Sequence, residues 1–187
     1  MLGIVFICIC VGAGKMWTEI AEPVLNPVFS KIINPFWMRM VLWIFLGFLS
    51  VSWLVYLTAS LFDHYRHPLE FGNGIILPVM GVIILLWERY GRKKEENRKP
   101  GIGNKKLFHK ESVFFLIVTV FIGWWMWYVF HSEQGILYTG FTVFSDYSPH
   151  TAMIRSFSWG NNFPTQYPYF GGEDVKYHFM FQFLTGN

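Results

Sequence analysis

The chain alternates long apolar runs with short polar segments. Residues 40–62, 71–88 and 112–131 are each almost entirely apolar. The third run ends in Trp124, Trp125, Trp127 and Tyr128, an aromatic belt of the kind found where a helix leaves a membrane. Because a helix needs about 20 apolar residues to cross a ~30 Å hydrocarbon core, this pattern predicts three transmembrane helices.

The amino terminus gives a weaker pattern. Residues 2–14 are apolar but fall short of the roughly 20 residues that a span requires. They also lack the basic start and small-residue cleavage site of a secretory signal. A membrane anchor, a signal-like start and a half-buried segment remain as alternatives, and we favour a fourth membrane helix. Residues 15–39 hold Pro23, Pro27 and Pro35, which favour an interfacial linker over one long helix.

The composition agrees with a membrane protein. Hydrophobic residues make up 53% of the 187 residues and charged residues only 14%, whereas soluble domains carry about 25% charged residues. We therefore predict an all-α, polytopic membrane protein with a transmembrane region over 1–131 and an outer segment over 132–187. Cys8 and Cys10 lie together in an apolar run and are interpreted as small apolar residues, with palmitoylation or redox chemistry as the alternative.

The distribution of basic residues predicts the topology. Nine of the fifteen Lys and Arg residues fall in residues 89–111, whereas only Arg155 and Lys176 are basic beyond the third run. By the positive-inside rule, residues 89–111 are cytoplasmic and residues 132–187 are extracytoplasmic, in the plasma membrane. The basic run is thus interpreted as a topology signal near the lipid bilayer, and we expect no nucleic-acid partner.

The outer segment carries the candidate chemistry. Ser148 and Pro149 predict a helix start, because a hydroxyl caps the helix and proline suits its first position. Asp146 is then expected just before this helix, His150 in its first turn and Arg155 further along. Residues 161–172 are expected to form an ordered loop.

A second outer helix is expected to follow that loop. Glu173 and Asp174 would open it, since negative charge is favourable at a helix amino terminus. Val175, Phe179 and Phe183 would form its apolar stripe, which we expect to rest on the membrane surface or against another helix. His178 lies within the same stretch.

This arrangement resembles the first outer loop of GT-C-type polytopic glycosyltransferases, which include protein O-mannosyltransferases and oligosaccharyltransferase catalytic subunits. The shared features are an outward helix, an Asp, a His, a spaced Arg and a Gly-Asn-Phe-Pro-like turn over residues 144–183. The resemblance implies that Asp146 binds a metal or acts as catalytic base, and that His150 and Arg155 position the acceptor or the donor phosphate. Glu173, Asp174 and His178 are further candidates for substrate binding. Asp146 stands alone where the family has an acidic pair, so a divalent metal stays an open alternative.

The implied reaction is sugar transfer from a lipid-phosphate donor. It needs a base for the acceptor hydroxyl and positive charge for the departing phosphate, roles that suit Asp146 and Arg155. The structural alternatives are a helix-capping Asp146, a surface Arg155, a packed His150 and helix-start charges at Glu173 and Asp174. GT-C enzymes have more spans than are visible here. We therefore expect the chain to be the amino-terminal part of a longer enzyme, inactive alone.

Two other classes of function compete with this one. The outer segment of a small non-enzymatic membrane protein could instead bind a partner. A transporter is less favoured, because no ionisable residue lies in the middle of the three clear runs, where one would mark an ion pathway. His64 and His67, in the short polar hairpin after the first clear run, could ligate a metal, but a solvated turn is the favoured interpretation.

Overall fold

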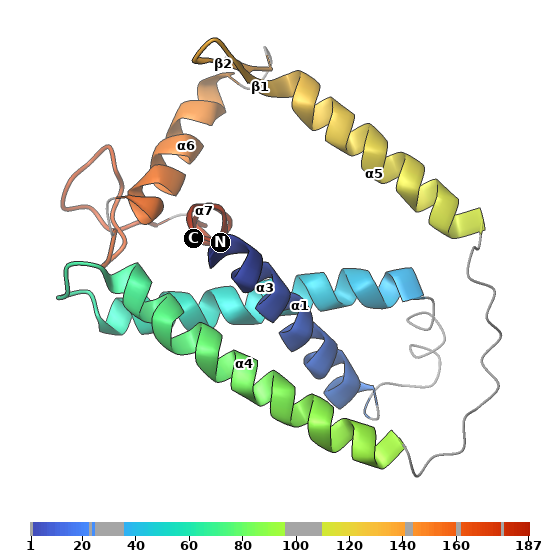
Figure 1. Ribbon diagram of the computed structural model, residues 1–187. Helices are drawn as coiled ribbons and strands as arrows, with labels where there is room; N and C mark the ends of the chain where they lie inside the picture. Colours follow the sequence, from blue (N-terminus) through green and yellow to red (C-terminus); the bar gives the residue numbers. More distant parts are fainter. Residues whose placement is uncertain are drawn as a thin grey trace. The chain divides into compact units, whose positions relative to one another are not determined.

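Long helices dominate the computed structural model, which describes residues 2–22, 24, 36–95, 110–140, 144–159, 162–176 and 178–187 (Figure 1). In chain order the elements are α1 (Leu2–Ala21), α3 (Phe36–Leu61), α4 (Pro68–Glu95), α5 (Lys110–Val129), β1 (Phe130–Glu133), β2 (Ile136–Thr139), α6 (Phe144–Ser158) and α7 (Met180–Gly186). The predicted fold class is confirmed. The centre of the basic loop and most of the proline-containing linker lie outside the described residues.

Three of the helices are long and apolar enough to cross a membrane, over Gly3–Ala21, Met38–Leu61 and Pro68–Gly91. The first corrects the expectation for residues 2–14, because α1 continues for a further two turns. The polar residues that suggested an earlier end have partners on α4: Lys15 Nζ lies 3.2 Å from Glu88 Oε1, and Trp87 Nε1 donates to Glu19 at 2.8 Å. The third predicted run corresponds to α5, whose described apolar part, Leu116–Val129, is shorter.

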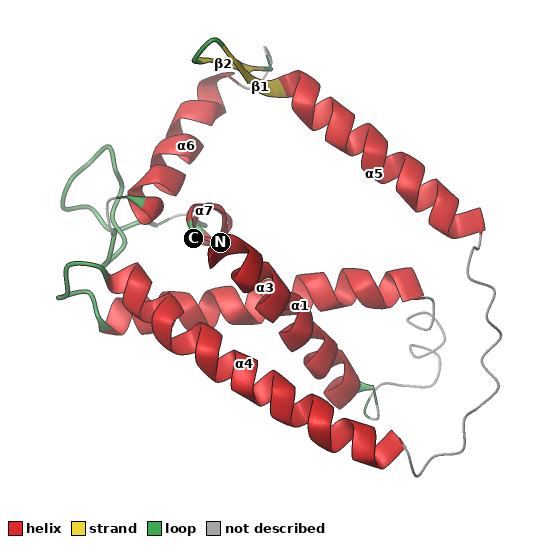
Figure 2. Cartoon of the chain, viewed as in Figure 1, coloured by secondary structure: helices red, strands yellow, loops and turns green. Residues whose placement is uncertain are grey.

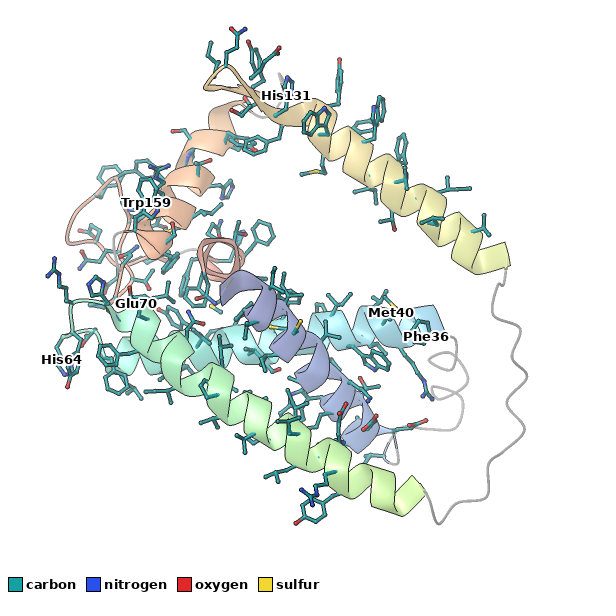
Figure 3. All side chains as sticks on the ribbon, viewed as in Figure 1. Phe36, Met40, His64, Glu70, His131 and Trp159 are labelled. Atoms are coloured by element: carbon teal, nitrogen blue, oxygen red, sulfur yellow. The ribbon has the colours of Figure 1, made fainter. Side chains whose placement is uncertain are left out.

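The chain divides into two compact units, Met1–Arg98 with Ala152–Asn187, and Lys99–Thr151. In the second unit α5 leads directly into an antiparallel hairpin that pairs Phe130 with Thr139 and turns at Gly135. Figure 2 shows these two strands between α5 and α6. His131 stacks on Tyr138 across the hairpin with ring centroids 5.0 Å apart, and Figure 3 marks its position.

In the first unit α1 and α3 pack antiparallel at very short range. A Cβ atom added to Gly14 would lie 1.8 Å from the carbonyl oxygen of Trp43, and one added to Gly47 would lie 1.8 Å from that of Cys10. Small residues let membrane helices approach this closely, and the resulting van der Waals contact drives their association. The tight α1–α3 pair therefore depends on hydrogen atoms in place of side chains at two positions.

The outer helices begin at other residues than predicted. α6 starts at Phe144, one turn before Ser148, so Asp146 lies inside its first turn and Pro149 within the helix. Pro149 is the sixth residue of α6, so it leaves one carbonyl of the extra turn without its intrahelical hydrogen bond.

The second outer helix begins at Met180 and not at Glu173. Residues 173–175 are drawn instead into pairing with residues 165–167: Tyr167 N donates to Glu173 O at 3.1 Å, and Asp174 forms a bridge with Gln166. The side chain of Asn162 holds the loop closed, donating to Gln166 O and accepting from Gln166 N, both at 2.8 Å. The prediction of an ordered loop is thus confirmed for its described part, from residue 162 onward.

An aromatic cluster joins this outer segment to the membrane helices within the first unit. Phe157 and Phe183 are fully buried, with ring centroids 5.3 Å apart. The ring of Tyr56 on α3 also packs against three phenylalanine rings, with centroid distances of 5.7 Å to Phe163, 5.1 Å to Phe179 and 5.3 Å to Phe183. Because buried aromatic pairs contribute about 0.5–1.5 kcal/mol each beyond their area, the cluster can fix the segment firmly on α3.

Candidate functional site

An apolar groove runs between α3 and α7 in the first unit. Its volume is about 730 Å³. The residues that line it are Val41, Ile44, Phe45, Phe48, Leu49, Ser52 and Trp53 of α3 with Met180, Phe181 and Leu184 of α7. The Ser52 hydroxyl donates to the carbonyl of Phe48 one turn earlier, so this donor is already used. The lining therefore suits a hydrocarbon chain and offers little to a polar ligand.

Two sets of hydrogen bonds, at Thr165 and at Asn187, tie the chain around α7 to α3 and α4. The Tyr56 hydroxyl lies 2.8 Å from Thr165 Oγ1, next to the aromatic cluster. Beyond the end of α7, Asn187 exchanges two amide hydrogen bonds with Asn73 of α4, at 2.5 and 3.4 Å. Polar groups inside membrane helices are costly unless paired. These two pairs thus satisfy polar atoms and fix the groove wall at once.

Asp146 and His150 lie one turn apart on α6. Successive residues of a helix are rotated by about 100°, so the two side chains leave the helix within about 40° of each other. Both are exposed. Between them in the sequence, Tyr147 stacks on Phe130 with ring centroids 5.2 Å apart, and burial raises the pKa of Tyr147 above its usual value. The predicted base and its histidine neighbour are therefore brought together on one helix face.

Arg155 points elsewhere. It follows Asp146 by nine residues, which places it about 180° around the helix axis from the carboxylate. Its guanidinium carbon lies 3.2 Å from the ring centroid of Trp159, in a cation–π contact. Trp159, labelled in Figure 3, stands at the carboxyl end of α6, where a positive charge is also favourable for the helix dipole. The structure gives Arg155 this local role and does not orient it with Asp146.

The remaining predicted residues lie in the loop before α7. Glu173 and Asp174 have exposed side chains and belong to the backbone pairing of the loop, so they do not open a helix. His178 is exposed too and precedes α7 by two residues.

The described residues contain no group of three or more His, Cys, Asp or Glu side chains arranged to hold a metal. In the α3–α4 turn, where Figure 3 marks His64, the two histidines each face one carboxylate: His64 Nδ1 lies 3.5 Å from Asp63 and His67 Nδ1 3.7 Å from Glu70. Each histidine has a local partner of its own, as expected for a solvated turn.

Sequence reasoning missed the residues that build the groove. A signal was present, because Tyr56 and Asn73 are polar groups inside apolar runs, and such groups require a partner. Their partners Thr165 and Asn187 follow more than a hundred residues later. The chain matches no protein-family model, no curated protein and no solved structure.

Proposed function

We propose that this chain takes part in sugar transfer from a lipid-phosphate donor, as the part of a membrane glycosyltransferase that binds the donor's hydrocarbon tail. The observation that carries the proposal is the groove between α3 and α7. A polyprenyl tail is a long apolar chain that lies in the bilayer, and the groove is lined by apolar side chains of a membrane-length helix. Such a lining would select the tail by burial of apolar surface.

The chemical step is assigned to Asp146 and His150. The carboxylate of Asp146 would take the proton of an acceptor hydroxyl as the acceptor oxygen bonds to the anomeric carbon. The bond from that carbon to the phosphate oxygen breaks, and the phosphate leaves with the electron pair. His150, one turn away, can donate a hydrogen bond to the leaving phosphate. The cation–π contact of Arg155 is the reason that it is given no part in this step.

A sugar-transfer assay tests the assignment of Asp146 as the catalytic base. In cells that express the Asp146→Asn variant, transfer of a labelled sugar from the lipid donor should be lost while the protein accumulates normally. Asp63→Asn, the same change in the α3–α4 turn, should leave transfer intact. Full activity of Asp146→Asn would remove the base assignment.

Photo-crosslinking tests the tail site separately. A polyprenyl phosphate with a diazirine on its tail should label peptides 41–53 and 180–184 of the chain in nanodiscs. Leu49→Trp, inside the groove, should reduce labelling severalfold, whereas Leu54→Trp should not. Leu54 lies on the same helix with a similar exposed fraction, 38% against 49%, but outside the groove. Equal labelling of the two variants would refute the tail site.

A second candidate is a non-enzymatic protein whose outer segment binds a partner. The orientation of Arg155 away from Asp146 favours it, because the charged groups of α6 are then spread over a surface. The two proposals separate in the same cells. Loss of sugar transfer with Asp146→Asn supports the enzyme, while unchanged transfer with loss of a co-purifying protein supports the partner-binding function.

A further inference from the structure

The depth at which α7 contacts α3 can be worked out from the span of α3. The apolar span Met38–Leu61 has 24 residues, about 36 Å at 1.5 Å per residue. Tyr56 and Ser52 precede Leu61 by five and nine residues, and so lie about 7 and 14 Å inside that end of the span. Because the hydrocarbon core is ~30 Å thick, roughly 3 Å of the helix at each end lies outside it. Both residues then remain about 4–11 Å within the hydrocarbon.

α7 packs at this depth. Its Phe183 contacts the ring of Tyr56 at 5.3 Å, and its Met180, Phe181 and Leu184 share the groove with Ser52. In Figure 1, α3 runs across the view while α7 is seen nearly end-on. α7 therefore meets α3 at the level of residues 52–56, and the groove that the two helices share extends from there to Val41.

The charges of the outer segment stop where this depth begins. Glu173, Asp174, Lys176 and His178 are exposed in the loop, whereas residues 179–187 contain no ionisable side chain. A boundary between water and lipid thus fits between residues 178 and 181.

The side chains of Asn187, Asn73 and Thr185, below that boundary, have hydrogen-bond partners. Asn187 and Asn73 form their two-way amide pair, and Thr185 donates its hydroxyl to Phe181 O at 2.9 Å. One backbone hydrogen bond closes each end of α7, from Phe183 N to Phe179 O and from Asn187 N to Phe183 O. Non-spanning backbone is tolerated at membrane depth only when its polar groups are satisfied in this way.

We infer that α7 is embedded in the leaflet at the Leu61 end of α3, and that its exposed face contacts lipid chains. Phe181, 70% exposed, is the residue that would meet the hydrocarbon. The lipid-facing surface of α3 continues onto it through the shared groove, which is why bilayer chains and not another protein are assigned to this face. The sequence had suggested a helix resting on the surface or against another helix. The depth of α7 does not depend on the proposed sugar transfer.

Phe170 provides a matched control for Phe181. It is the same residue type with nearly the same exposed fraction, 69%, but lies in the charged loop. Each position would be changed to cysteine in the full chain with Cys8→Ala and Cys10→Ala, reconstituted in nanodiscs, and given a nitroxide label. Frequent collision of the label with oxygen indicates that the label is exposed to lipid. Frequent collision with a water-soluble nickel chelate indicates that it is exposed to water.

The expected result is opposite behaviour at the two positions. The label at 181 should collide with oxygen severalfold more than with the nickel chelate, and the label at 170 should show the reverse. Nickel access at 181 equal to that at 170 would overturn the inference, because α7 would then lie in water. Low access to both reagents at 181 would overturn it too, since protein would then cover this face. A membrane-impermeant maleimide should react with the cysteine at 170 but reach the one at 181 only after solubilisation in SDS.

Discussion

Replacing Gly47 by alanine should separate α1 from α3. The added methyl carbon would lie 1.8 Å from the carbonyl oxygen of Cys10, whereas real Cβ contacts essentially never fall below 3.0 Å, so the backbones must part by at least 1.2 Å (3.0 − 1.8). Neither atom can rotate away, because both belong to a rigid helix. Overpacking typically costs about 1–3 kcal/mol. We expect the free energy of unfolding to fall by about 3 kcal/mol, since the displacement affects the whole α1–α3 contact.

Gly74 is the internal control for this prediction. It is also helical, but a Cβ added to it has nothing within 4 Å. Alanine there should be neutral or should stabilise by about 0.5–1 kcal/mol, the ordinary gain of replacing a helical glycine. The two variants are thus expected to differ in stability by about 3–4 kcal/mol, with Gly47→Ala destabilising and Gly74→Ala neutral or stabilising.

Reversible unfolding of the purified chain in mixed micelles, followed by Trp fluorescence as the SDS mole fraction rises, measures this difference. Gly47→Ala should unfold at a clearly lower SDS fraction and Gly74→Ala at the native fraction or above it. If the two midpoints coincide, α1 and α3 do not pack through this contact.

Three further changes test how the first unit is held together. Tyr56→Phe removes only the hydroxyl bonded to Thr165 and should lower stability by about 1 kcal/mol. Amide exchange should become faster in residues 162–176 alone, and unchanged exchange there would contradict the prediction. Glu88→Gln breaks a half-exposed ion pair with Lys15 and should cost under about 1 kcal/mol in the same unfolding assay, so a larger loss would show that Lys15 is more deeply buried. Gly186→Ala would place a methyl carbon 2.5 Å from a carbonyl oxygen of α6, and a native midpoint for this variant would argue against the docked position of α7.

The hydropathy pattern determined the membrane class and the positions of α3 and α4. Apolar runs of span length report on burial in lipid directly, since each residue must be compatible with hydrocarbon wherever its neighbours lie. The amino-terminal helix was predicted too short because polar residues inside it interrupt the apolar run. Lys15 and Glu19 look like the end of an apolar run until their partners on α4 are known.

The candidate site was only partly predictable. Asp146 was expected just before the first outer helix and His150 in its first turn, whereas α6 starts at Phe144 and contains both. The helix predicted to start at Glu173 was wrong, because pairing with residues 165–167 replaced the local preference for negative charge at a helix start.

The sequence by itself thus determined which segments enter the bilayer as long helices, since that depends on the composition of each segment alone. Only the tertiary structure decided the groove, the close approach at Gly14 and Gly47, and the depth of α7. These features depend on pairs far apart in the chain, such as Asn73 with Asn187, separated by 114 residues. A hydropathy pattern reports on each segment separately and does not show which distant residues meet. Only the folded backbone brings the two amides together.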